Sequence, residues 1–171
     1  MSFKLSELQN IAKKKGPEYF IGPDRMVCLH STLFAVNDAL LGVDIIDYVH
    51  PEVIKASSGL VAGLWTSEGA CGIATAAGIL ISLKNGTSDP RDREGRYLTG
   101  TKAREFWHWF KDEFGSCRCS DLSLVNNWGD KEQGLWYNDN RRTFCGEILG
   151  KTASKLVEIL TVDNPKVVRD E

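Results

Sequence analysis

Five cysteines are the residues of this chain with the greatest capacity for chemistry, at positions Cys28, Cys71, Cys117, Cys119 and Cys145. Thiolates bind soft metals and iron-sulfur clusters, and they also take part in thiol-disulfide exchange. Structural zinc sites usually draw on close C-x-x-C pairs, whereas the closest pair in this chain is a C-x-C. Spacing alone therefore leaves ligand, catalytic and merely buried thiols open, because free cysteine often packs as a small hydrophobic side chain.

Four of these cysteines are predicted at or near the starts of four different helices, and they are Cys28, Cys71, Cys119 and Cys145. Unpaired N–H groups and the helix dipole favour anions there, so we expect thiolates to be stabilised. Arg118 beside Cys119, with Arg141 and Arg142 before Cys145, adds positive charge. These arginines could lower thiol pKa values or offset a negatively charged thiolate cluster, or they could be surface residues.

The first half of the chain reads as helices separated by glycine and proline. Apolar spacing predicts a helix from Leu5 that ends at Gly16-Pro17. A second helix should begin near Asp24 and end before Gly42. A third helical region begins at Asp44, where Pro51 must start a new helix or kink the old one. The apolar stripe of the second helix is Leu29, Leu33, Val36 and Leu40.

The second half continues in the same way. A loop of glycines around 66–70 precedes a helix over 71–84, for which a buried, central position fits best. Residues 85–101 read as an exposed loop, 102–114 as a helix stopped by Gly115, and 116–122 as the start of a short helix. An irregular segment over 126–140 precedes a last helix from about Thr143 to Leu160, which places Cys145 in its first turn.

Alternating strand patterns and fixed-period repeats are both absent from the sequence. We therefore predict an all-α, single-domain helical bundle of five to seven helices with two longer irregular loops. The helical domain should cover residues 1–160, followed by a polar C-terminal tail over 161–171.

The charge and hydropathy of the chain argue against nucleic-acid and membrane partners. Lysine and arginine number 21 against 23 acidic residues, so the formal charge of -2 gives no general attraction to nucleic acid. The longest mostly apolar stretch, 72–83, is well short of the ~20 residues that cross a bilayer, and the N-terminus does not read as a signal peptide. We expect a cytoplasmic protein with no nucleic-acid or membrane partner. An unidentified redox partner is expected, and a homodimer is left open.

Four segments of the chain resemble the C_GCAxxG_C_C family of redox-active proteins. The first cysteine of the pattern is similar to Cys28 in 26–29, and the central motif is similar to 70–76 around Cys71. The third and fourth cysteines are similar to Cys119 in 114–122 and Cys145 in 141–145. Ala70 and Ala76 stand where the central motif is expected to have glycines. Cys117 is extra relative to the four, as a resolving thiol, an alternative ligand or a bystander, of which we favour the bystander.

The resemblance implies redox activity, and three hypotheses follow. The leading one is an iron-sulfur cluster or other metal bound by Cys28, Cys71, Cys119 and Cys145, for electron transfer or redox sensing. The second is a cofactor-free dithiol protein with Cys117–Cys119 or Cys145–Cys28 as the reacting pair. The third is a non-catalytic interaction domain with buried thiols. Its partner surface would consist of Trp128, Trp136 and Tyr137.

Overall fold

The computed structural model describes residues 2–23, 25–45, 49–123 and 139–170. These residues form seven α-helices, one 3-10 turn and one two-stranded sheet, which confirms the all-α prediction. The helices are α1 (Leu5–Ile21), α2 (Cys28–Ala39), α3 (Pro51–Ser57), α4 (Gly72–Asn85), α5 (Arg93–Phe114), α6 (Cys119–Ser123) and α7 (Asp139–Leu160). The 3-10 turn η1 is Ser58–Leu60, and the strands are β1 (Phe3–Lys4) and β2 (Val167–Val168).

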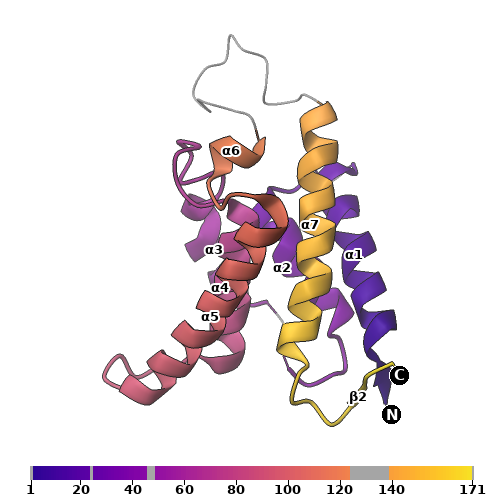
Figure 1. Cartoon of the computed structure of the whole chain (residues 1–171), viewed down its shortest axis with the longest axis vertical. Helices are drawn as coiled ribbons and strands as arrows, with labels where there is room; N and C mark the ends of the chain where they lie inside the picture. The colour runs from indigo at the N-terminus through magenta and orange to yellow at the C-terminus, as the bar shows by residue number, and fades with distance from the viewer. Residues whose placement is uncertain (1, 24, 46–48, 124–138, 171) are drawn as a thin grey trace.

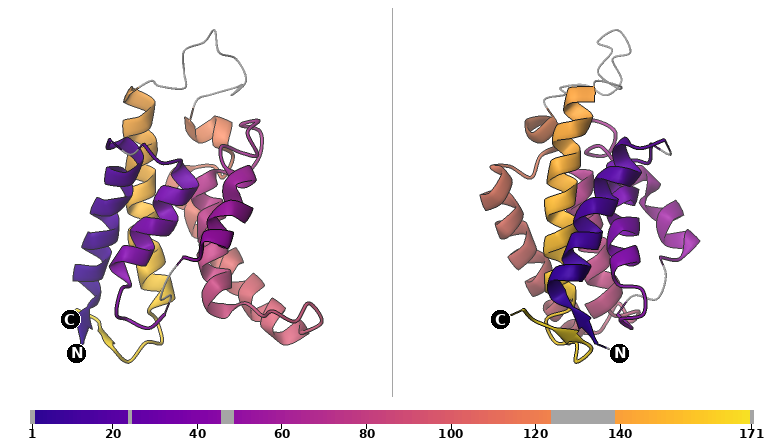
Figure 2. Two further views of the ribbon diagram at one scale, coloured as in Figure 1. Left: turned by 180° about the vertical axis from the view of Figure 1, so that it is seen from behind. Right: turned by 90° about the vertical axis from the view of Figure 1, so that its right-hand side faces the viewer.

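The bundle is built around α2, α4 and α7. Helix α1 packs along α7 and α2, and α2 in turn contacts α4 and α7. Helix α5 packs against α4, and α6 lies at the end of the molecule opposite the two termini (Figures 1 and 2). The predicted apolar stripe of α2 is confirmed, because its members are at most 1% exposed, namely Leu29, Leu33, Val36 and Leu40.

Helix α4 is the central apolar helix that the sequence predicts. It contacts α2, α5 and α7, and seven of its residues from Gly72 to Ile81 are buried. Across the part of the chain that the structure describes, none of the helices combines the length and the apolarity that crossing a bilayer requires.

Helix α1 continues through Pro17 to Ile21, so the prediction that Gly16-Pro17 ends it is wrong. A proline inside a helix leaves the carbonyl four residues earlier without its N–H partner. In this chain the freed carbonyl oxygen of Lys13 faces Gly150 of α7, where an added Cβ atom would lie only 2.8 Å from it. Close packing between the two helices therefore carries α1 past the proline.

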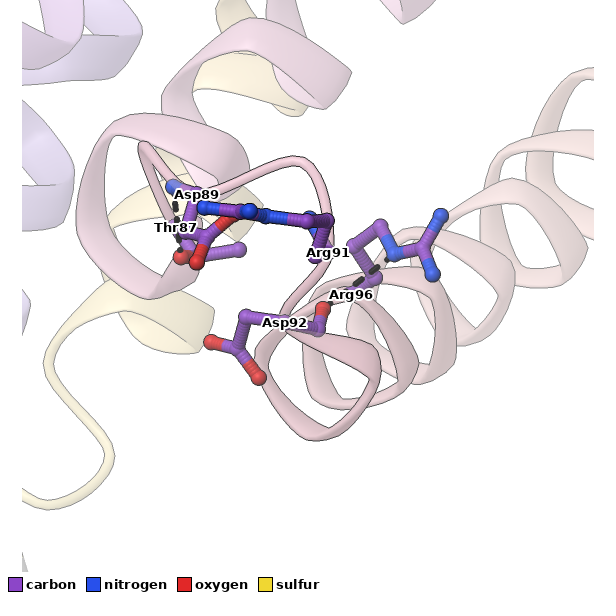
Figure 3. Close-up of polar contacts among 5 residues, drawn as sticks. All are labelled: Thr87, Asp89, Arg91, Asp92 and Arg96. Carbon is purple, nitrogen blue, oxygen red and sulfur yellow. Dashed lines mark hydrogen bonds and ion pairs between the residues drawn. The ribbon is translucent and has the colours of Figure 1, made fainter.

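Helix α5 begins at Arg93, so most of the predicted loop over 85–101 is helical instead. The Asp92 carboxylate accepts a hydrogen bond of 3.0 Å from the Gly95 backbone N–H, which caps the helix. Arg96 Nε donates to the Asp92 carbonyl oxygen at 3.2 Å (Figure 3). The helix ends as predicted at Gly115, whose φ of +81° suits glycine.

Three other helix starts differ from or refine the predictions. Helix α2 begins at Cys28 rather than near Asp24, which lies outside the described residues. Pro51 begins a new helix, α3. Helix α7 begins at Asp139, before the predicted start near Thr143, while most of the irregular segment predicted over 126–140 lies outside the described residues.

The two ends of the chain meet in a short parallel sheet, although the sequence shows no strand pattern. Strand β1 pairs with β2 in the register Phe3 to Val167 and Lys4 to Val168. Part of the predicted polar tail is therefore paired with the N-terminus, close to the two chain ends marked in Figure 1. The division at residue 160 stays a prediction.

Candidate functional site

Four of the five cysteines line one cavity of about 300 Å³. They come from four separate segments of the chain and are Cys28, Cys71, Cys119 and Cys145. Apolar side chains form most of the remaining wall, and Arg25 and Arg142 also reach the cavity. Three of these cysteines are buried, and Cys28 is partly buried. The fold thus brings together residues that stand up to 117 positions apart in the sequence, since Cys28 and Cys145 belong to α2 and α7.

Backbone hydrogen bonds fasten the Cys71 segment to the Cys119 segment. The Cys71 N–H donates to the Cys117 carbonyl oxygen at 2.8 Å, and the Cys119 N–H donates to the Gly69 carbonyl oxygen at 3.0 Å. Ala70 and Arg118 form an antiparallel bridge between these contacts. Cys71 and Cys119 are therefore held as a pair by main-chain geometry, before any ligand is considered.

Cys28 and Cys71 occupy helix starts as predicted. Cys28 is the first residue of α2, and Cys71 is the N-cap of α4. The backbone N–H groups of Ala62 and Leu29 act to lower the pKa of the Cys28 thiol, and that of Ile73 acts to lower the pKa of the Cys71 thiol. These donors are the groups that a helix start or a tight turn leaves available for an anionic sulfur.

Cys119 also stands at a helix start, whereas Cys145 does not. Cys119 is the first residue of the short helix α6, and its Sγ lies 3.8 Å from Ser123 Oγ. Cys145 lies six positions after the first residue of α7, in the second turn, so its predicted place in the first turn is wrong. Only the N–H groups of the first turn of a helix lack a partner within the helix, so the backbone N–H of Cys145 is not one of the donors that a helix start offers to an anion.

The predicted arginines separate into different roles. Arg142 lines the cavity and lies over the Phe20 ring, 4.8 Å from its centroid. Arg118 is exposed and lies outside the cavity lining, and the side chain of Arg141 lies outside the described side chains. Arg25 lines the cavity although the sequence offered no signal for it.

Cys117 stands apart from the other four. It is the one cysteine of the five, all of which the structure describes, that does not line the cavity. Its Sγ lies 3.8 Å from the Trp107 carbonyl oxygen of α5, and the residue is 8% exposed. Only its backbone takes part in the site, through the bond from the Cys71 N–H.

Burial opposes charge on the cavity thiols. Burial first, and then the charges of Cys119 and Cys145, raise the pKa of the Cys28 thiol to about 12 despite the two N–H donors. Burial and the charges of the neighbouring cysteines raise the pKa of Cys71 well above its ordinary value. The expectation that helix starts stabilise thiolates in the cofactor-free protein is therefore wrong for these two residues, because desolvation outweighs the local hydrogen bonds.

None of the five cysteines, all of which the structure describes, is in a disulfide. Within the described residues, no three cysteine, histidine or acidic side chains lie close enough together to hold a single metal ion. Ala62 and Trp65 also form part of the cavity wall, although the only local signal for this in the sequence is the cluster of glycines at 59–72.

The fold and the cavity define a class of small helical proteins with four cysteines converging from separate helices. Residues 26–159 match the family described as "Putative redox-active protein (C_GCAxxG_C_C)", and the chain belongs to this family. Aligned on Cys71, Ala70 takes the place of the glycine in the name's GCA, and Gly72 takes the place of its alanine. The second glycine of the name falls on Thr75, so its predicted place at Ala76 is wrong. No curated protein and no solved structure matches the chain.

Proposed function

We propose that this chain is a redox protein that binds an iron-sulfur cluster through Cys28, Cys71, Cys119 and Cys145, for electron transfer or redox sensing. The observation that carries the proposal is the single cavity of about 300 Å³ that all four thiols line while Cys117 lies outside it. Four thiol donors in an otherwise mainly apolar cavity fit a cluster in their chemistry, since Fe–S clusters are held by cysteine thiolates. When bound, such a cluster supplies one-electron chemistry.

A cluster accounts for the spacing of the thiols better than a single ion does. A tetrahedral zinc site needs all its sulfurs about 2.3 Å from one centre. No such grouping occurs among the described side chains, although four thiols share one cavity. The four thiolates that hold an iron-sulfur cluster bind different iron atoms, one thiolate to each iron in a [4Fe–4S] cluster and two in a [2Fe–2S] cluster, so the four sulfurs need not meet at one centre.

The raised pKa values of the cavity thiols also favour a bound iron-containing cluster over a cysteine that acts as a free thiolate nucleophile. A dithiol enzyme needs a low-pKa attacking cysteine, whereas the pKa of Cys28 is raised to about 12. Iron binding would remove the thiol protons and offset the mutual repulsion of the thiolates. The residues of this chain would assist through the N–H donors of Ala62, Leu29 and Ile73, and through the charge of Arg142.

Anaerobic reconstitution with iron and sulfide tests this proposal. We expect bound iron, acid-labile sulfide and a visible charge-transfer band in the wild-type chain. Serine variants of the four cavity cysteines should each lose cluster, whereas Cys117→Ser, a matched change outside the cavity, should retain it. The proposal would be overturned if the wild-type chain bound no iron and sulfide after reconstitution, or if Cys117→Ser lost as much cluster as the four cavity variants do.

The cofactor-free alternative keeps one supporting observation, which is that Cys28 and Cys145 share the cavity. It predicts that oxidised protein titrates two fewer thiols than reduced protein, and that the loss maps to this pair. The other pair considered, Cys117 and Cys119, is less suited because the two side chains lie in different surroundings. Thiol counting on iron-free protein therefore separates the two functions.

A further inference from the structure

One wall of the cavity is a backbone segment in an unusual conformation. The four consecutive residues Ala62, Gly63, Leu64 and Trp65 have φ values of 51°, 62°, 61° and 61°. Ser67 follows with φ of 62°. We call residues 62–67 the strap. Left-handed backbone costs roughly 1–2 kcal/mol for each residue other than glycine and normally occurs at single positions, so a run that includes leucine and tryptophan is strained.

Hydrogen bonds hold the strap in this conformation. The Trp65 N–H donates to the Val61 carbonyl oxygen at 2.9 Å, and the Ser67 N–H donates to the Ala62 carbonyl oxygen at 3.0 Å. The indole Nε1 of Trp65 donates to the Ser58 carbonyl oxygen at 3.2 Å. The far end is fixed by the Ser120 N–H, which donates to the Ser67 carbonyl oxygen at 2.8 Å.

The strap contributes to the cavity wall and also faces solvent. Ala62 and Trp65 line the cavity, and the backbone N–H of Ala62 acts to lower the pKa of the Cys28 thiol. Trp65 is nevertheless 46% exposed and its neighbour Leu64 is 57% exposed. The indole therefore has one side toward the cavity and another toward water. A strained segment with exposed apolar side chains is also the kind of region that opens locally, ahead of global unfolding.

We propose that the strap is a gate to the cysteine cavity, with Trp65 as the residue that controls what reaches the four thiols. The gate opens when the strap gives up its left-handed turn, which releases backbone strain and swings Trp65 away from the cavity mouth. It closes when the hydrogen bonds to Val61, Ala62 and Ser58 re-form. The gate concerns access alone and requires no bound cluster, so it stands independently of the proposed function.

Alkylation of the reduced, cluster-free chain tests the gate. Iodoacetamide labelling is followed at each cysteine by mass spectrometry, and the key pair of variants is Leu64→Gly and Leu60→Gly. Both add the same flexibility to the unfolded chain, and both remove an exposed leucine, but only Leu64 has a positive φ. The difference between them therefore reports the left-handed penalty, reduced by the roughly 0.5–1 kcal/mol of freedom that glycine at position 64 adds to the open strap.

Relief of strain in the closed state should slow opening. We expect the cavity thiols to react roughly threefold to tenfold more slowly in Leu64→Gly than in Leu60→Gly. Trp65→Ala should react at least about tenfold faster than wild type, because the wall and the bond to Ser58 are both lost. Cys117 lies outside the cavity and provides the internal reference, so its labelling should change little in any of these variants.

Three results would overturn the gate. Equal labelling of the cavity thiols in Leu64→Gly and Leu60→Gly would show that the left-handed backbone does not control access. A Trp65→Ala variant no faster than wild type would show that the indole is not a barrier. A rise in Cys117 labelling that matches the rise at the cavity thiols would assign the strap a general structural role instead.

Discussion

A Cβ atom added to Gly72 would lie 2.7 Å from the sulfur of Cys28. The next nearest atoms, Ala62 N and Leu29 Cβ, would be at ordinary contact distances of 3.5 and 3.6 Å. The position of the Cys28 thiol in this chain thus depends on glycine following Cys71, where the family's name has alanine. The two cysteine segments are coupled sterically as well as through their shared cavity.

Gly72→Ala should move the Cys28 sulfur without unfolding the protein. The clash involves the end of a side chain, so we expect the free energy of unfolding to fall by only about 1 kcal/mol, the low end of the cost of overpacking. Displacement of the sulfur from the Ala62 N–H should speed alkylation of Cys28. Gly78→Ala on the same helix is the control, because its added Cβ meets nothing within 4 Å. That variant should gain about 0.5–1 kcal/mol in stability with unchanged Cys28 labelling.

Equal Cys28 labelling in the two glycine variants would contradict this account. It would mean that the sulfur already samples positions clear of Gly72.

Alkaline pH should destabilise the reduced, cluster-free protein through Cys28. The folded-state pKa of about 12 is above the ordinary value of 9.0, so between these pH values the unfolded chain has lost a proton that the folded chain keeps. Stability is therefore fully present below about pH 9 and falls as pH rises toward 12. Chemical denaturation at several pH values measures the slope. Cys28→Ser should reduce the pH dependence of the free energy of unfolding by an amount that corresponds to at most one proton. An unchanged pH dependence would contradict the raised pKa of Cys28.

The sequence predicted the fold class and the apolar stripe of α2, because both depend on local periodicity that packing then confirms. It also predicted Cys28 and Cys71 at helix starts, where Val27 is the N-cap of α2 and Cys71 is the N-cap of α4. The gathering of the cysteines rested on family resemblance instead. Local pattern cannot show which distant helix ends meet, since that depends on how the helices pack.

The errors have physical causes that a single local signal does not reveal. Helix α1 passes Pro17 because α7 packs closely against it, and α5 begins early because Asp92 caps it ahead of a glycine-containing first turn. The raised pKa of Cys28 arises from burial, which depends on the whole fold and outweighs the helix-start effect. The left-handed strap is likewise invisible in the sequence, because Leu64 and Trp65 are poor residues for that conformation.

Gly150→Ala should be clearly destabilising, because its Cβ would lie 2.8 Å from the main-chain carbonyl oxygen of Lys13. A backbone atom cannot move aside as a side-chain end can, so the α1–α7 contact must widen. We expect a loss of about 1–3 kcal/mol in thermal or chemical unfolding. Gly100→Ala in α5 meets nothing within 4 Å and should be neutral or stabilising. Similar stabilities for the two variants would show that the helices do not need this close approach.

Arg142 should tune the potential of the proposed cluster. Its side chain lies over the Phe20 ring and lines the same cavity as the four thiols. A nearby cation stabilises the reduced, more negative form of a thiolate-bound cluster and so raises the reduction potential. In reconstituted protein, Arg142→Gln should therefore lower the potential measured by redox titration, while Arg142→Lys should recover part of the loss. Arg118→Gln is the matched control, because Arg118 adjoins Cys119 in sequence yet is exposed outside the cavity lining. If Arg118→Gln shifts the potential as far as Arg142→Gln does, proximity within the cavity is not what sets the effect.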